Sequence, residues 1–217
     1  MRSCAGSRPR GLAGASWLGL FAALLAGGDA AALELDELLR GMASAPGVHA
    51  RFVETKEIAI LSAPLESRGE IFFVPPRRFA RLTSRPSATR FVVDGDRLLF
   101  RDAAGEQQLN AAGSRVARAV VENFIVLFNG DAEGLAARYD TEFSSTGTAW
   151  RLALRPKDRN VASLLSRVVL AGDGPVLLEM SLEEPNGDRT RTRYEDVRVA
   201  PLSEGELGRA FADEATP

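Results

Sequence analysis

The first regular pattern of apolar and polar positions in the chain is helical and lies between Glu34 and Ala45. Its apolar residues recur at the spacing of one helix face, at Leu35, Leu38, Leu39 and Met42. Pro46 and Gly47 follow and end the pattern. We therefore expect a short amphipathic helix that buries one stripe of side chains.

From Val48 onward the pattern becomes that of β-strands. Segments rich in aromatic and aliphatic residues follow one another, namely VHARFVETKEIAIL, GEIFFV, RFARLT and TRFVVDGDRLLF. Prolines at 75, 76 and 86 separate some of them. The Asp94-Gly95 pair lies between two apolar runs, which is a strong hairpin signal. This region therefore predicts successive antiparallel strands.

Helical spacing returns between Ser114 and Asn129. Ser114 is suited to cap the first turn and Gly130 to end the helix in a left-handed conformation. The apolar residues that share one face are Val116, Val120, Phe124, Leu127 and Phe128. A second short helix is expected at 132–138. Strand-like segments linked by Gly-Asp-Gly and Asn-Gly turns then continue to about residue 199, so we predict one antiparallel meander interrupted by a helical insertion.

Several of the expected strands carry consecutive large apolar residues instead of alternating ones. They occur at 71–74, 91–93 and 98–100. Strands of an antiparallel sheet usually turn one face to water, so these runs indicate that both faces are covered. Helices and a second layer of sheet are one explanation, and a curved sheet whose hollow side holds an apolar ligand is the other. Periodicity alone does not choose between them.

The segment 1–32 has the features of a secretory signal. Three arginines precede an apolar stretch at 17–25, and Ala30-Ala31-Ala32 offers small residues for cleavage. The apolar stretch is short for a membrane span, although a retained anchor is the alternative. We expect cleavage near Ala32, export to the periplasm, and a single domain over residues 33–217.

Removal of this segment changes the chemistry of the chain. The single cysteine, Cys4, lies within it, ahead of the apolar stretch, so no lipid-bearing or catalytic thiol is expected in residues 33–217. The chain has 27 basic and 29 acidic residues, and the segment contains three arginines and Asp29, so the remainder carries a net charge of about −4. A mildly acidic chain has no electrostatic footprint for nucleic acid.

The residues that enzymes need are scarce in this sequence. His49 is the only histidine, and no nucleophile elbow, phosphate loop or dinucleotide fingerprint is present. Carboxylate pairs such as Asp94 and Asp96 flank turn glycines, where solvated turn chemistry explains them. We expect no enzyme activity, no metal and no cofactor. A cofactor-free hydrolase is the weakest of the functions considered.

A strand at 189–194 carries its charges on one side. Arg189, Arg191 and Arg193 alternate there with Thr190, Thr192 and Tyr194. A solvated face of an edge strand is the plain interpretation. If the arginines border a cavity mouth instead, Arg191 is a candidate for binding a lipid phosphate or carboxylate.

The order of these features resembles the periplasmic lipoprotein carrier family, LolA. The resemblance runs from about residue 35 to 211, through VHARFVE, GEIFFVPPRRFARLTSRP, FVVDGDRLLFRD, the helical insertion, WRLALRPKD, EEPNGDRTRTRYEDV and a late Phe211. It implies a mainly β (α+β) fold, a half-open antiparallel β-barrel with helices forming a lid over an apolar cavity. The missing lipid-bearing cysteine favours the soluble carrier over the membrane-anchored receptor of similar fold.

The resemblance also implies a function. We expect a monomeric carrier that binds acyl chains of a lipoprotein or other lipid and shuttles it from an inner-membrane exporter to an outer-membrane receptor. The expected cavity lining is Phe52, Ile71, Phe73, Phe79, Phe91, Val93, Phe100, Trp150 and Leu152, and the expected lid face is Val116, Val120, Phe124, Leu127 and Phe128. A sensing or scaffold module that binds without shuttling is the alternative.

One position departs from the family pattern. Lipoprotein carriers usually have an arginine just before the proline that ends the GEIFFV-type strand, and its side chain latches the lid. That position is Pro75 here, which has no side-chain donor. Arg77 and Arg78 are the candidates to replace it. We therefore expect a specialised paralogue that moves another acylated lipid or a pigment precursor.

Overall fold

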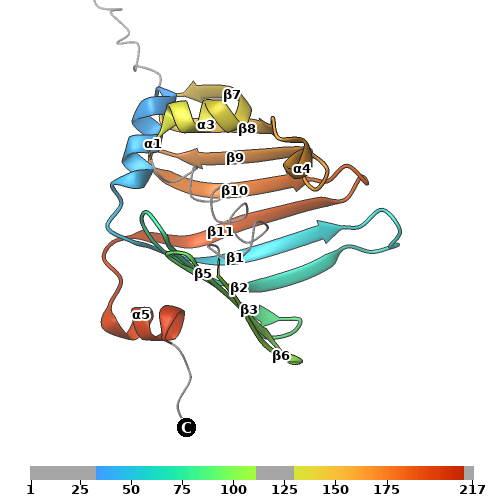
Figure 1. Cartoon of the computed structure of the whole chain (residues 1–217). Helices are drawn as coiled ribbons and strands as arrows, with labels where there is room; N and C mark the ends of the chain where they lie inside the picture. The colour runs from blue at the N-terminus through green and yellow to red at the C-terminus, as the bar shows by residue number, and fades with distance from the viewer. Residues whose placement is uncertain (1–32, 111–129, 213–217) are drawn as a thin grey trace, which may run out of the picture. The chain divides into compact units, whose positions relative to one another are not determined.

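The computed structural model describes residues 33–110 and 130–212. These residues form one eleven-stranded sheet with four helices (Figure 1). The helix expected at 114–129, with its lid face, lies outside the described residues, as does the segment 1–32. The leader and the lid therefore stay predictions.

The first part of the chain forms helix α1 (Leu35–Ala43) and then six strands in succession. These are β1 (Val48–Glu57), β2 (Leu65–Val74), β3 (Arg78–Arg85), β4 (Thr89–Asp94), β5 (Arg97–Asp102) and β6 (Gly105–Asn110). Each strand pairs antiparallel with the next, so they form a first meander. The Asp94-Gly95 hairpin is confirmed, because Gly95 adopts a φ of 63° between β4 and β5.

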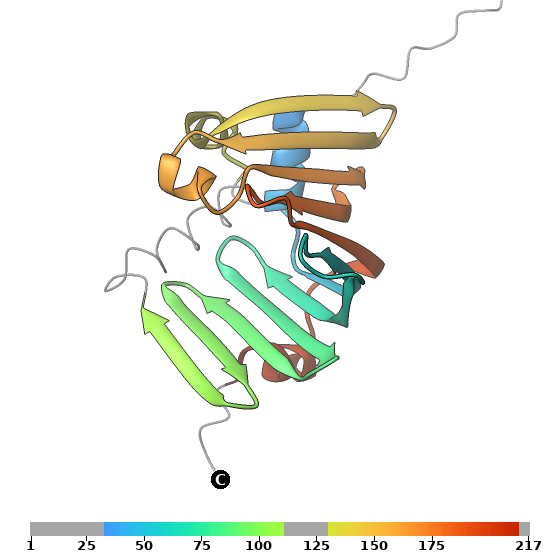
Figure 2. The same ribbon diagram turned by 90° about the vertical axis from the view of Figure 1, so that its right-hand side faces the viewer.

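The second part begins with helix α3 (Ala132–Arg138), where the short helix was predicted. A second meander follows, with strands β7 (Tyr139–Thr146), β8 (Ala149–Pro156), β9 (Arg167–Asp173), β10 (Val176–Glu183) and β11 (Arg189–Val199), and helices α4 (Arg159–Ala162) and α5 (Glu204–Phe211). In Figure 2 the strands β7–β10 lie above those of the first meander.

The two meanders join through their first and last strands. β1 pairs antiparallel with β11, which gives the order β6-β5-β4-β3-β2-β1-β11-β10-β9-β8-β7. β6 and β7 form the two edges, so the sheet does not close on itself. The fold is the mainly β, half-open antiparallel barrel that was expected. β11 is a central strand, however, so the interpretation of its arginines as part of an edge strand is wrong.

The register places two different sets of apolar residues on the two faces of the sheet. We name the face that carries Ala50, Ile71 and Phe73 the inner face, and the opposite one the outer face. On the inner face of β8–β10, α1 and α3 bury a core that includes Leu38, Leu39, Leu135, Trp150, Leu152, Leu154 and Leu170. The helices therefore cover the inner face of the second meander.

The outer face of the first meander is covered by α5 instead. Phe72, Ala80, Val92 and Leu99 project from that face and pack against Ala210 and Phe211. His49 stacks on Phe72 with a ring centroid distance of 4.5 Å, which gives this single histidine a packing role on the outer face. A capping box of Ser203 and Glu206 begins α5. The consecutive apolar residues of β2, β4 and β5 thus arise because α5 covers one face while the inner face stays apolar too.

Within the described residues, no helix has both the length and the apolar character that crossing a bilayer requires.

Candidate functional site

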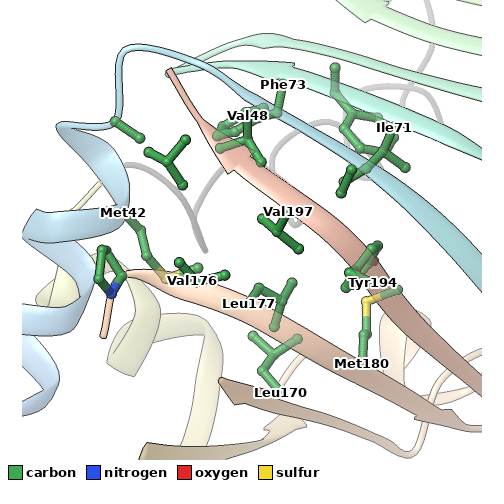
Figure 3. A pocket seen from close by; sticks show the side chains of 15 residues that line it. Met42, Val48, Ile71, Phe73, Leu170, Val176, Leu177, Met180, Tyr194 and Val197 are labelled. Atoms are coloured by element: carbon green, nitrogen blue, oxygen red, sulfur yellow. The ribbon is translucent and has the colours of Figure 1, made fainter. Parts of the chain in front are cut away.

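An apolar pocket opens on the inner face where the two meanders meet. The empty space within it amounts to about 760 Å³, a figure that includes space open to solvent. Its lining consists of Met42, Ala45, Val48, Ala50, Ile71, Phe73, Phe79, Leu170, Pro175, Val176, Leu177, Met180, Tyr194, Val197 and Val199. Figure 3 shows these side chains, ten of them labelled, gathered around the space between α1, β10, β11 and β2.

The pocket exists because strands from both meanders contribute to it. β1 and β2 supply Val48, Ala50, Ile71 and Phe73, and β10 and β11 supply the residues opposite. The register shifts between His49 and Arg51 relative to β11, where Asp196 adopts a φ of 51°. This bulge lets Tyr194, Val197 and Val199 all reach the pocket despite their uneven spacing.

Tyr194 brings the one side-chain hydroxyl of the pocket lining. Burial raises the pKa of Tyr194 to about 12, while the nearby Arg81 lowers it and Glu54 raises it. The phenol therefore stays protonated at neutral pH. Otherwise the lining consists of aliphatic side chains, methionines and two phenylalanines, which offer an apolar surface and no charge.

The nine residues expected to line a cavity all lie on the inner face, because the register connects them pairwise across the sheet. Ile71, Phe73 and Phe79 line the pocket. Phe91 and Val93 pack beside it with Leu98 and Phe79. Phe100 lies further along the same face and is exposed to 40%.

The remaining three expected lining residues have other neighbours. Trp150 and Leu152 belong to the core beneath α1, and the Trp150 Nε1 donates to the Gly174 carbonyl oxygen at 2.8 Å. The Phe52 ring is 1% exposed and lies under the Arg81 guanidinium, 4.0 Å from the ring centroid. These positions place the three side chains outside the pocket lining, and their contact with a ligand stays a prediction.

The three arginines proposed for a headgroup or latch each pair with a carboxylate. Arg77 pairs with Asp96 and Arg78 with Asp94, so both are engaged by the β4–β5 hairpin. Arg191 pairs with Glu179 at 3.5 Å on the outer face, opposite to the pocket. The inner face of β11 carries Thr192 and Tyr194 instead.

Sequence reasoning missed much of the second meander's contribution to the pocket. Met180 stands between two polar residues, so the sequence indicates that its side chain points inward. Leu170 and Leu177 stand in consecutive apolar runs, which do not indicate a direction. Their meeting with Ile71 was not predictable either, because it depends on the pairing of β1 with β11. Among the described residues, no cluster of three or more His, Cys, Asp or Glu side chains is arranged to hold a metal ion.

At the family level, residues 19–197 match the family described as outer membrane lipoprotein carrier protein LolA-like. No curated protein matches the chain in sequence.

Three solved structures are among those to which the chain is similar. A LolA superfamily protein from Nitrosomonas europaea is 10% identical, with a TM-score of 0.41 over 80% of this chain and 96% of that one. MucB of Pseudomonas aeruginosa, in complex with MucA, is 20% identical with a TM-score of 0.45 over 79% of this chain, which spans only 59% of that chain. The Mycobacterium tuberculosis lipoprotein LppX is 10% identical with a TM-score of 0.38 over 78% and 99%.

Proposed function

This chain belongs to the outer membrane lipoprotein carrier protein LolA-like family, and on that premise we propose that it is a periplasmic carrier of acylated cargo. In this proposal the inner-face pocket takes up acyl chains of a lipoprotein or another lipid, and the protein shuttles that cargo from the inner to the outer membrane. The observation that carries the proposal is the apolar lining of the pocket, to which both meanders contribute.

Acyl chains need such a pocket to cross an aqueous compartment. Each methylene that leaves water contributes about 0.8 kcal/mol, so a whole chain is strongly held in a membrane. The pocket is lined by side chains from six strands and by Met42 of α1, together with Ala45 and Pro175. Its partial opening to solvent supports reversible binding, because a ligand that is only partly enclosed is released more readily than one in a sealed cavity.

Carriage requires no chemistry on the cargo. Binding and release of an acyl chain break no covalent bond, so the proposal does not call on a nucleophile, a general base or a cofactor. It extends to the periplasmic location, to a leader that is removed near Ala32, and to a monomeric carrier that meets an inner-membrane exporter and an outer-membrane receptor.

The decisive experiment is to find the ligand. Protein extracted gently from its native envelope should release acyl lipid into an organic solvent, as detected by mass spectrometry, and the emptied protein should enhance the fluorescence of the apolar dye ANS. Empty protein that also fails to bind the dye would contradict the proposal.

A matched pair of variants assigns the binding to the pocket. Leu177 lines the pocket, whereas its neighbour Leu178 is 43% exposed and does not. Leu177→Glu removes apolar contact worth about 1.5–3 kcal/mol and adds the cost of desolvating a carboxylate, so at least tenfold weaker dye binding is expected. Leu178→Glu introduces the same charge at the surface and should bind as the parent does. Equal binding by the two variants would place the ligand elsewhere.

The cargo is a separate part of the proposal. With Pro75 at the latch position and both Arg77 and Arg78 paired within the β4–β5 hairpin, we propose a specialised paralogue for a lipid other than the general lipoprotein pool. Cells depleted of the general carrier should then fail to deliver lipoproteins when they produce this protein. Full delivery by the unchanged protein, with no gain from Pro75→Arg, would establish the general carrier role instead.

A further inference from the structure

A compact polar cluster lies on the inner face next to the apolar pocket. The Arg81 Nη1 donates to the Glu54 Oε2 and the Arg81 Nη2 to the Glu54 Oε1, both at 2.8 Å. The Thr192 hydroxyl donates to the Glu54 Oε2 at 2.8 Å, and the Ser67 hydroxyl to the Oε1 at 3.2 Å. We name these four residues the inner polar cluster. It joins strands β1, β2, β3 and β11.

The inner polar cluster begins where the pocket ends. Side chains two residues apart in a strand share a face, so the inner face of β1 runs from Ala50 through Phe52 to Glu54. On β11 it runs from Tyr194 to Thr192. Ala50 and Tyr194 line the pocket. Beyond them on the same face, Phe52 lies beneath the cluster, and Glu54 and Thr192 belong to it. Across β2 and β3, Arg81 pairs with Ile71, which also lines the pocket.

Phe52 shows that the cluster covers apolar surface that would otherwise continue the pocket. The ring lies over Gly69, where an added Cβ would come within 2.8 Å of the Phe52 Cε1. The Arg81 guanidinium lies over a face of the ring, 4.0 Å from its centroid. Without the guanidinium, the aromatic face of Phe52 would extend the apolar surface by one step toward Glu54.

The cluster is charged and internally satisfied. Burial raises the pKa of Glu54, but hydrogen bonds and the charge of Arg81, with hydrogen bonds from Thr192 and Ser67, outweigh it and hold the pKa below its usual value. The carboxylate is therefore ionised at neutral pH. The side chains of Arg81 and Glu54 remain 24% and 18% exposed, so water still solvates part of the pair.

An apolar chain gains nothing by passing over such a pair. It would displace the remaining water from two charges and offer no hydrogen bond in return, which is unfavourable. We propose that the Arg81–Glu54 pair is the polar end wall of the pocket, and that it sets the longest acyl chain the protein can enclose. This inference rests on the proposed function, since it concerns the same pocket.

The test replaces the wall with apolar side chains and measures the preference for chain length. Removing both charges together avoids an unpaired buried charge, and such replacements commonly preserve or increase stability. Arg81→Met with Glu54→Leu is the primary variant. Saturated fatty acids of increasing length are titrated against ANS bound to the parent and to the variant.

For the parent protein, affinity should rise by up to about fourfold per methylene, equivalent to about 0.8 kcal/mol, and then level off at the length that reaches the wall. For the double variant, the rise should continue by two or more methylenes. Chains beyond the limit of the parent should then bind at least about tenfold more tightly, whereas short chains should bind equally to both proteins.

The matched control removes an ion pair of the same composition from the outer face. Arg155 and Glu142 pair on β8 and β7, where both are exposed, so Arg155→Gln with Glu142→Gln should keep the chain-length limit of the parent. If the primary variant fails to fold, Arg81→Met with Glu54→Gln keeps an acceptor for the Thr192 hydroxyl and should show a smaller shift in the same direction.

Two results would overturn the end wall while leaving the carrier proposal intact. An unchanged chain-length limit would show that the pair does not bound the pocket. An equal loss of affinity at every length would show that Arg81 holds the polar head of the ligand instead. Failure of the parent itself to bind any fatty acid or ANS would contradict the proposed function.

Discussion

Trp150 in the second meander and Phe52 in the first occupy corresponding positions, each opposite a glycine of the neighbouring strand. Trp150 pairs with Gly172 and Phe52 with Gly69, and an added Cβ would lie 2.5 Å from the Trp150 Cζ2 and 2.8 Å from the Phe52 Cε1. Each aromatic ring thus lies close to the place that a side chain on the opposite glycine would occupy. They differ in their cover, which is the leucine-rich face of α1 for Trp150 and a guanidinium for Phe52.

This difference shows that different groups cover the inner faces of the two meanders. In the second meander α1 and α3 fill the inner face, and ion pairs such as Arg155 with Glu142 occupy the outer one. In the first meander α5 fills the outer face. Among the described helices, none joins the small inner-face cluster of Val93 and Leu98.

The largest test of this comparison truncates one aliphatic residue in each region. Leu152 is 1% exposed beneath α1, so Leu152→Ala should cost about 2–5 kcal/mol of unfolding free energy. Ile71 borders a pocket that is already open, so Ile71→Ala should cost less than half as much and should weaken dye binding instead. Urea unfolding of both variants without ligand gives the comparison. Equal losses of stability would mean that the first meander is a closed core as well.

A smaller effect is expected from filling the two glycine gaps. The added Cβ at Gly172 would lie 2.0 Å from the Val176 carbonyl oxygen, and that at Gly69 2.0 Å from the Leu82 carbonyl oxygen. Either alanine forces backbone to move, which should cost about 1–3 kcal/mol.

The two alanine variants should nevertheless differ in what they disturb. Gly172→Ala displaces Trp150, which is the only tryptophan outside the segment 1–32, so its fluorescence should shift. Gly69→Ala displaces Phe52 and with it Arg81, so the chain-length preference should change while the fluorescence does not. Identical signatures from both variants would remove the distinction between core and pocket.

The smallest expected effect is on the pH dependence of stability. It compares Glu54 on the inner face with Glu142 on the outer face. The pKa of Glu54 lies below its usual value of 4.5, so this group stabilises the fold above that pH, and its contribution is lost as the pH falls through the lower folded pKa. The hydrogen bond and charge of Arg155 also lower the pKa of Glu142, but that group is exposed on the outer face. We therefore expect the pH dependence of the unfolding free energy to weaken, relative to the parent protein, more in Glu54→Gln than in Glu142→Gln. A larger change in the outer variant would contradict the solvation difference between the two faces.

The helices and strands were largely predictable from the sequence, because their signals lie within a few neighbouring residues. The apolar spacing from Leu35 to Met42 gave α1, and Asp94-Gly95 gave the hairpin between β4 and β5. α5 was missed although Ser203 and Glu206 form a capping box, because Gly205 and Gly208 lower helix propensity in a short segment. The helix that covers the outer face therefore went unrecognised.

The site was less predictable because it depends on contacts between distant segments. All nine proposed lining residues lie on the inner face, since strand periodicity governs direction. Which of them line the pocket depends on where α1 packs. Ile71 and Leu152 are both aliphatic residues of predicted strands, but Ile71 lines the pocket and Leu152 belongs to the core beneath α1. The central position of β11 follows from its pairing with β1, which no local pattern encodes.

The pairing of β1 with β11 also bears on when the pocket comes into being. Each meander consists of neighbouring strands that can pair soon after they are synthesised, because their contacts are local in sequence. The pocket needs Ala50 and Ile71 on one side of the junction and Tyr194 and Met180 on the other. Until the last strand has paired, neither half has the complete lining of the pocket. Under the proposed function, lipid can therefore be taken up only after β11 has paired with β1 and the fold is complete.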